Sequence, residues 1–290
     1  MPARRWKPDP KQWAPCPVHP VLAHPQERRR SLDGEWMFRL DPDDVGRKRG
    51  WQESPDSLDA AVSVPGCWQG QGHGHDGTER VWDFRLDART FRATYEGTGW
   101  YGRAFAVPQA WDGARVWLCF GGVHPAAEVW LNGHRLGEHA APFVPFAFEV
   151  TEHIRRGAEN FVAVRVHEAF RWLGFAYNWQ GHWSGLYRSV ELLATGPAFL
   201  ERLWILPDPR EGLLRVRGRA GASRGSLELN LSASPISGGR SVSHREALAG
   251  CGEFAFDLPV ASPKLWSPDE PNLYRVDAAL RAGGEVLDAR

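Results

Sequence analysis

The segment with the densest side-chain chemistry is an aromatic stretch at residues 170–183. Flat aromatic rings stack on the C–H faces of sugars, and amide and imidazole groups form hydrogen bonds with sugar hydroxyls. The candidate ligand-binding residues of this stretch are Trp172, Tyr177, Asn178, Trp179, Gln180 and His182. This composition predicts a loop that binds a carbohydrate, and the alternative is a loop that packs beneath another domain.

A glycine-rich loop at residues 72–77 offers two other kinds of site. It matches G-x-G-x-x-G, but no strand precedes it and no helix follows it, as a dinucleotide-binding turn requires. His73, His75 and Asp76 are metal ligands by residue type, although the flanking glycines hold them loosely and no complete ligand set is evident. We therefore expect a polar loop with no bound cofactor and no metal.

No motif in the sequence identifies a catalytic site for hydrolysis. The sequence contains no G-x-S-x-G motif on which a serine triad could be built. Glycoside hydrolysis needs two carboxylates at a fixed separation, and no such pair can be assigned among 35 acidic residues. Glu128, beside Trp130 in a predicted strand, is expected to face solvent or a backbone donor.

The overall composition excludes several classes of partner. Basic and acidic residues number 35 each and are interspersed, so neither nucleic acid nor a membrane surface is an expected partner. No apolar run approaches the roughly 18 residues that a membrane span requires. The four cysteines form no C-x-x-C pair, and the N-terminal stretch lacks an apolar signal core, so we expect a cytoplasmic protein.

The elements that position these residues are predicted to be strands. Apolar residues alternate with polar or small ones at 35–40, 162–166, 214–219, 227–232 and 253–258. Strands buried on one face only are typical of antiparallel sandwiches, so Trp36 and Phe38 are expected in one core, and Phe254, Phe256 and Leu258 in another. No long helices alternate with the strands, and the predicted fold class is therefore all-β.

Turn chemistry gives two local predictions. Asn132-Gly133 lies between two β-rich runs and predicts a tight hairpin. Thr151 as an N-cap and Gly157 as a stop predict a single-turn helix at 152–156, which is the best helix candidate in the chain.

Composition divides the chain into three parts. Residues 1–27 are rich in proline and charge and predict an extended lead-in. Residues 28–196 carry tryptophan-rich strands with long loops, and the size suits a jelly roll. Residues 197–290 carry shorter strands, and their number is close to that of an immunoglobulin-like sandwich.

Several motifs occur in order along residues 28–290. They are L-D-G-E-W at 32–36, V-P-G-C-W-Q at 64–69, W-Y-G-R at 100–103, A-E-V-W-L-N-G at 127–133, G-L-Y-R at 185–188 and L-W-S-P-D-E-P-N-L-Y at 265–274. Together they resemble the motifs of family 2 glycoside hydrolases, the group of β-galactosidases, β-glucuronidases and β-mannosidases.

The resemblance implies a galactose-binding-like jelly-roll sugar-binding domain followed by an immunoglobulin-like domain. In family members a (β/α)₈ barrel of roughly 250 residues follows and carries both catalytic glutamates. The chain is therefore expected to be the N-terminal, non-catalytic portion of such a glycosidase, inactive alone, with a barrel as its partner. The alternative is a stand-alone carbohydrate-binding or interaction module without catalysis.

The resemblance also bears on the choice of sugar. In many members the loop before the G-I-Y-R strand holds an Asp that touches the terminal sugar, whereas this sequence has Trp179 there, next to Asn178. Galactose, glucuronate and mannose all stay open as substrates. One stacked ring with a few hydrogen bonds predicts only weak binding of a β-glycoside.

Overall fold

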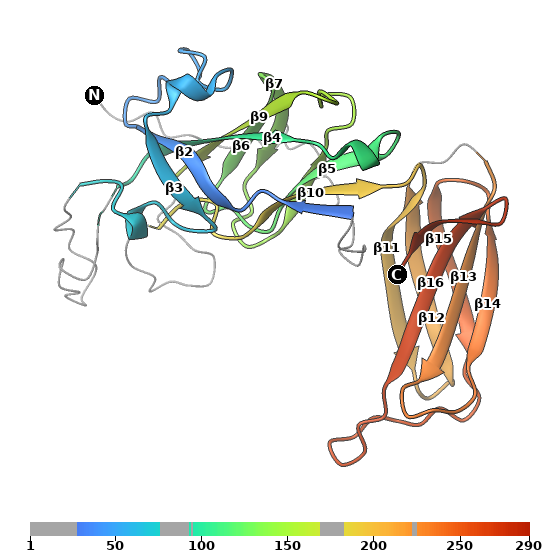
Figure 1. Cartoon of the computed structure of the whole chain (residues 1–290). Coiled ribbons are helices and arrows are strands. Elements are labelled where there is room, and N and C mark those ends of the chain that lie inside the picture. Colours follow the sequence, from blue (N-terminus) through green and yellow to red (C-terminus); the bar gives the residue numbers. More distant parts are fainter. Residues whose placement is uncertain (1–27, 76–92, 94, 169–182, 222–224) are drawn as a thin grey trace. The chain divides into compact units, whose positions relative to one another are not determined.

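The computed structural model describes residues 28–75, 93, 95–168, 183–221 and 225–290 (Figure 1). The predicted lead-in at 1–27 lies outside these residues. Two compact units are formed, by Arg29–Leu193 and by Ala194–Arg290. Nowhere in the described residues is a helix long and apolar enough to cross a membrane.

The first unit contains two sheets (Figure 1). The larger sheet has the strand order β3-β2-β4-β9-β6-β7, and each neighbouring pair is antiparallel. Its strands are β2 Gly34–Asp41, β3 Ala60–Val64, β4 Thr98–Ala106, β6 Ala127–Leu131, β7 His134–His139 and β9 Glu159–His167. The smaller sheet, in the order β1-β10-β5-β8, consists of β1 Arg29–Ser31, β5 Arg115–Phe120, β8 Phe146–Glu149 and β10 Val190–Thr195. This unit is a jelly-roll sandwich, as the sequence predicts.

The core of the first unit is aromatic. Trp36 and Phe38 of β2 are almost completely buried, which confirms the predicted phase of that strand. The ring of Phe38 lies 5.0 Å from that of Tyr101 and 5.7 Å from that of Trp68. Aromatic pairs at such distances stabilise beyond the area that they bury.

The prediction of burial on one face only is wrong for β9, and the neighbouring strand β6 resembles it in this respect. Both strands are buried on both faces along nearly their whole length. The second face is covered by a tryptophan layer, in which Trp100 stacks on Trp130 at 5.2 Å and meets Trp51 edge-on at 6.1 Å. Trp51 comes from the segment between β2 and β3, so this segment forms a third layer over the sheet.

The hairpin prediction is confirmed, and the helix prediction is wrong. Asn132 and Gly133 join β6 to β7 with φ angles of 53° and 81°, the left-handed pair that a tight hairpin needs. Among the described residues the helices are single 3₁₀ turns, η3 Pro55–Ser57, η4 Gln69–Gln71 and η6 Gln109–Trp111. Residues 151–153 form a turn only. The Thr151 hydroxyl accepts a hydrogen bond from Val116 N and donates to Glu149, so it caps no helix.

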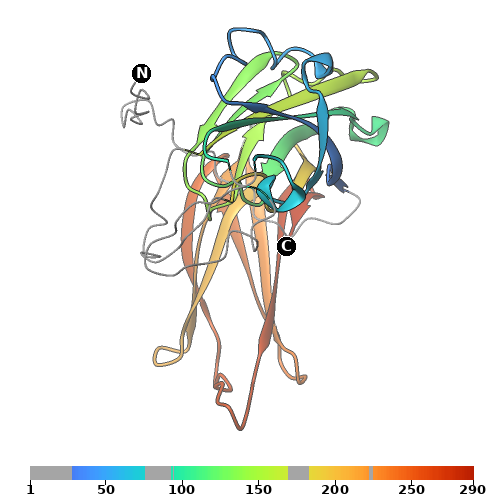
Figure 2. The same ribbon diagram turned by 90° about the vertical axis from the view of Figure 1, so that its left-hand side faces the viewer.

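The second unit is a sandwich of a three-stranded and a four-stranded sheet (Figure 2). The first sheet, β11-β12-β15, contains β11 Phe199–Asp208, β12 Leu213–Gly221 and β15 Gly252–Pro259. The second sheet, β14-β13-β16-β17, contains β13 Leu227–Pro235, β14 Val242–Leu248, β16 Tyr274–Ala282 and β17 Glu285–Ala289. All described pairs in it are antiparallel, and the unit is immunoglobulin-like, as predicted.

The predicted core face of β15 is confirmed. Phe254 and Leu258 are buried, and Phe256 is half-buried with its ring stacked on His244 at 4.4 Å. On β13, Leu229 and Leu231 are buried on the facing sheet.

Replacing Phe254 with alanine should lower the free energy of unfolding by about 3–5 kcal/mol, because the substitution removes a buried ring and leaves a cavity. Urea denaturation followed by circular dichroism measures the loss. Trp204→Ala is the control, since its side chain is 52% exposed on the outer face of β11 and should change stability by less than about 1 kcal/mol. Equal losses in the two variants would contradict the assignment of the core face.

Candidate functional site

All residues that the sequence analysis proposed for sugar binding lie outside the described residues. They are Trp172, Tyr177, Asn178, Trp179, Gln180 and His182, within the stretch 169–182. The structure does describe the residues on either side of this stretch, Glu168 and Trp183. The candidate site is therefore built from the stem of the loop.

The stem is closed by a buried polar cluster, which we call the clamp, formed by Gln69, Glu168 and Ser184. The Gln69 amide nitrogen donates to Glu168 Oε2 at 3.1 Å, and Gln69 Oε1 accepts from Ser184 N at 2.8 Å. The Ser184 hydroxyl also donates to Glu168 Oε2. All three residues are at most 4% exposed. The two ends of the stretch 169–182 are thus joined through one side-chain amide.

The clamp also contacts the backbone of Tyr95. The other hydrogen of the Gln69 amide is donated to the carbonyl oxygen of Tyr95 at 3.1 Å. Tyr95 follows the stretch 76–92, which likewise lies outside the described residues. Glu168, Ser184 and Tyr95 therefore all bind the side chain of Gln69, the first residue of the turn η4.

An aromatic cluster lies beside the clamp. Trp183 stacks on His124 with ring centres 3.9 Å apart, and Tyr187 meets Trp183 edge-on at 5.3 Å. Phe143 lies 6.0 Å from His124 and is 56% exposed, so one flat apolar ring of the cluster faces solvent. The loop stem thus combines ring stacking with a buried hydrogen-bond network.

His124 is held as a neutral imidazole. Its Nδ1–H donates to the carbonyl oxygen of Trp183 at 2.6 Å, which fixes the tautomer because a carbonyl can only accept. Burial lowers the pKa of His124 to about 4, and the hydrogen bond to Trp183 only partly opposes this effect. A neutral ring stacks on tryptophan without the desolvation cost of a buried charge.

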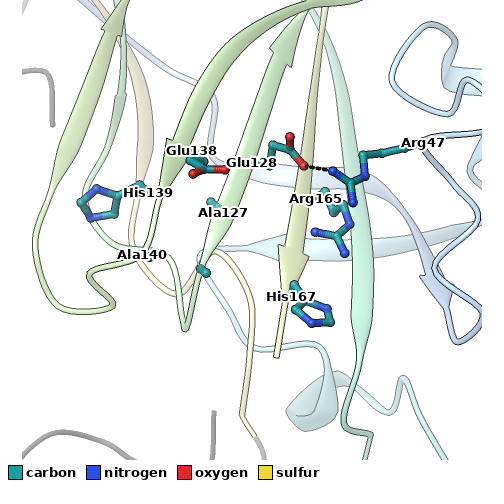
Figure 3. Close-up of a pocket in the computed structure, with 9 residues that line it drawn as sticks. Arg47, Ala127, Glu128, Glu138, His139, Ala140, Arg165 and His167 are labelled. Atoms are coloured by element: carbon teal, nitrogen blue, oxygen red, sulfur yellow. Dashed lines mark hydrogen bonds and ion pairs between the residues drawn. The ribbon is translucent and has the colours of Figure 1, made fainter. Parts of the chain in front are cut away.

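A separate small cavity opens on the outer face of the large sheet, and Figure 3 shows the side chains around it. Arg47, Glu128 and Arg165 line it together with two histidines, His139 and His167. Its volume is about 50 Å³. A water molecule needs at least ~10–15 Å³, so the cavity has room for a few waters and is too small for a sugar ring.

The expectation for Glu128 is wrong. Its carboxylate is bound by guanidinium groups, with Arg135 at 2.7 Å and Arg47 at 3.4 Å, and the residue is only 8% exposed. Arg165 lies opposite Glu128 on the neighbouring strand but forms its ion pair with Asp44. Burial alone would raise the pKa of Asp44, but the Arg165 guanidinium lowers it below its usual value. This network is a structural ion-pair layer beneath the cavity.

The glycine-rich loop is described by the structure as far as His75. No group of three metal-ligating side chains occurs among the described residues. His73 Nε2 lies 2.9 Å from the carbonyl oxygen of Ala61, and its ring packs on Phe38 at 4.8 Å, which places it against the sheet. Asp76, the third candidate ligand, lies outside the described residues.

Sequence reasoning missed the clamp. Gln69 was noticed only as the last residue of the V-P-G-C-W-Q motif, and Glu168 and Ser184 were not singled out. The signal in the sequence is indirect: two polar residues, Glu168 and Ser184, flank the aromatic-rich stretch 169–183. Their common partner stands 115 residues before Ser184, which no local pattern reveals.

Comparisons with known proteins agree with this architecture. A family model described as glycosyl hydrolases family 2, sugar binding domain, matches residues 29–196, and one described as glycosyl hydrolases family 2 matches residues 211–290. The β-galactosidase of Klebsiella pneumoniae is 29% identical over 94% of this chain, which covers 29% of that protein. The β-glucuronidase of Paenibacillus borealis is 26% identical over 87% of this chain, which covers 42% of that protein.

The solved structures show the same fold. The crystal structure of a Bacteroides uniformis β-glucuronidase aligns with a TM-score of 0.70 at 22% identity, covering 90% of this chain and 31% of that one. The Ruminococcus gnavus β-glucuronidase aligns with a TM-score of 0.69 at 21% identity, covering 95% of this chain and 45% of that one.

The two family models define the class of protein, a family 2 sugar-binding domain followed by the immunoglobulin-like unit. The chain belongs to glycoside hydrolase family 2. It corresponds to the N-terminal, non-catalytic portion of its relatives and spans less than half of the length of the two relatives above.

Replacing Gln69 with leucine should lower the free energy of unfolding by about 1–3 kcal/mol, because Glu168 and Ser184 N would lose a buried partner. Gln71→Leu is the matched control: its amide bonds the Ser63 backbone at an exposed position, where water can replace it. Urea denaturation of both variants measures the difference. A Gln69→Leu variant as stable as Gln71→Leu would contradict the role of the clamp.

Stability should fall as the pH drops from about 6.5 to about 4. The unfolded chain protonates His124 near its ordinary pKa, whereas the folded chain resists protonation until about pH 4, so the unfolded state binds more protons in this window. Each such group lowers the free energy of unfolding by up to about 1.4 kcal/mol per pH unit. His139 and His167, whose pKa values burial also lowers, act in the same direction.

Denaturation curves at several pH values test this, with His124→Gln as the comparison. The variant should show a shallower loss of stability between pH 6.5 and pH 4 than the parent chain. Identical slopes would show that the pKa of His124 is the same in the folded and unfolded chain, which would contradict its burial as a neutral ring.

Proposed function

We propose that this chain presents the sugar of a β-glycoside to the catalytic domain of a family 2 glycosidase. The observation that carries the proposal is the clamp, because it ties both ends of the stretch 169–182 to the sugar-binding domain. The proposed sugar contacts are ring stacking and hydrogen bonds from Trp172, Tyr177, Asn178, Trp179, Gln180 and His182.

In this proposal a barrel partner supplies both catalytic carboxylates. The best-placed carboxylate beside the loop, Glu168, is buried and accepts two hydrogen bonds in the clamp, so it is not available as an acid or a nucleophile. Phe143 and Val144 are 56% and 51% exposed beside the loop stem. Exposed apolar side chains at this place suit coverage by the barrel.

Two further assignments belong to the proposal. The sugar-binding domain is taken as residues 28–196 and the immunoglobulin-like domain as residues 197–290. The protein is assigned to a reducing compartment, the cytoplasm, since Cys67, Cys119 and Cys251 are free thiols.

Monosaccharide binding by this chain should be weak. One stacked ring and two or three hydrogen bonds that compete with water contribute about 3–4 kcal/mol, which corresponds to a Kd in the millimolar range or weaker. NMR titration with methyl β-glucuronide and methyl β-galactoside measures it. Trp179→Ala should remove the binding and leave the fold intact, whereas Trp204→Ala, on the second unit, should leave the binding unchanged.

Micromolar binding that survives Trp179→Ala would contradict the proposed contacts and place the sugar elsewhere. Hydrolysis of an aryl β-glycoside by this chain, abolished by one Asp or Glu substitution, would contradict the non-catalytic assignment itself.

A further inference from the structure

The small cavity on the outer face of the large sheet has both acidic and basic side chains around it (Figure 3). The acids are already engaged. Glu128 and Glu138 both bind the Arg135 guanidinium, at 2.7 and 3.0 Å, and Asp44 binds Arg165 at 2.7 Å. A cation that entered the cavity would have to compete with guanidinium groups for these carboxylates.

The basic groups, in contrast, keep unused hydrogen-bond donors. In Arg165, Nε and Nη2 donate to Asp44, at 3.1 and 2.7 Å, and Nη2 also donates to the Thr98 hydroxyl. Among the contacts of the described residues, Arg165 Nη1 has no acceptor, and it is open to water in a residue that lines the cavity. The contact described for Arg47 is a 3.4 Å hydrogen bond to Glu128, which leaves most of its N–H groups without an acceptor.

His167 adds a third donor. The Thr98 hydroxyl lies 2.7 Å from His167 Nδ1 and 3.5 Å from Asp44, so its hydrogen goes to the nearer acceptor, Nδ1. The ring proton of the neutral imidazole is therefore on Nε2. Burial lowers the pKa of His167, and the charges of Arg165 and Arg47 lower it further, against the opposing charge of Asp44. The imidazole thus lies in a positive potential.

The size and the remaining donors of the cavity favour a small spherical anion. Its volume of about 50 Å³ accommodates a few waters, and chloride is only slightly larger than a water molecule. A carboxylate is best bound by two parallel N–H groups of one guanidinium, and the Arg165 fork is already taken up by Asp44. Single N–H groups from separate side chains suit an ion that accepts hydrogen bonds from any direction.

We infer that this cavity binds a chloride ion through N–H groups of Arg47, Arg165 and His167. Figure 3 shows these three side chains on one side of the cavity, opposite Glu138 and His139. The ion offsets the repulsion between the two guanidinium groups. It also joins the segment between β2 and β3, which carries Arg47, to strand β9, which carries Arg165. The site does not depend on the sugar contacts proposed above.

The test follows the linewidth of the chloride NMR signal in the presence of the full chain, as sodium chloride replaces sodium gluconate at constant ionic strength. Gluconate is too large for the cavity, so it holds the ionic strength without competing. Exchange of chloride with the cavity should broaden the signal, and the excess linewidth should follow a saturation curve for one site per chain. The melting temperature should rise along the same series, because the ion binds the folded state only.

Arg47→Gln should weaken chloride binding about tenfold, because it removes charge-assisted hydrogen bonds from a side chain that is half exposed. Arg217→Gln is the matched control. Arg217 is also half exposed and forms a 3.5 Å ion pair, with Asp257, but it lies on the second unit and outside the cavity lining. This variant should bind chloride like the parent chain.

A second pair of variants uses Ala140, which lines the cavity and is exposed, so neither substitution threatens the fold. Ala140→Glu places a negative charge at the cavity and should weaken chloride binding about threefold or more, whereas the uncharged Ala140→Gln should bind like the parent chain. Lack of saturable broadening, equal binding by Arg47→Gln and Arg217→Gln, or equal binding by the two Ala140 variants would each overturn the inference.

Discussion

A carboxylate that is removed from water must find hydrogen-bond donors inside the protein, and in the first unit this demand joins residues that are far apart in the sequence. Glu168 stands directly after the central strand β9 and is 4% exposed. Its donors come from Gln69 and Ser184, which stand 99 residues before it and 16 residues after it. Breaking either contact leaves a buried charge short of a partner, which is more costly than the contact itself is stabilising. The described ends of the aromatic stretch are therefore fixed by the solvation of one side chain.

The same principle builds the outer layer of the large sheet. Asp41, at the end of β2, is 1% exposed and accepts hydrogen bonds from Val45 N and Gly46 N, each at 2.8 Å, and from Trp100 Nε1 at 2.9 Å. These contacts fold the following segment back over the sheet. A Cβ on Gly46 would lie 2.5 Å from Trp100 Nε1 and 2.6 Å from the Trp51 ring, so only glycine allows this approach. The turn that Asp41 holds at Val45 and Gly46 therefore brings in the segment that covers the second face of β9.

These long-range contacts mark the boundary of what the sequence predicts. The Asn132-Gly133 hairpin could be predicted because its conformation is set by two adjacent residues. The Thr151 helix failed because the hydroxyl that would cap it binds β5, a partner outside the local pattern. The clamp could not be predicted for the same reason, since Gln69 and Ser184 are 115 residues apart. The alternation of apolar residues predicted the buried face of a strand correctly where only one face is buried. It failed for β9, because the segment between β2 and β3 covers the other face of that strand.

The geometry of the clamp also limits where sugar specificity can reside. The Gln69 amide uses both of its hydrogens, on Glu168 and Tyr95, and its oxygen accepts from Ser184 N. A side chain engaged in this way positions other residues and has no donor left for a ligand. Relatives named β-galactosidase and β-glucuronidase both match this chain over most of its length, although galactose and glucuronate differ in the configuration at C4 and in the group at C5. Under the proposed function, a clamp with no free donor leaves that discrimination to other residues than Gln69.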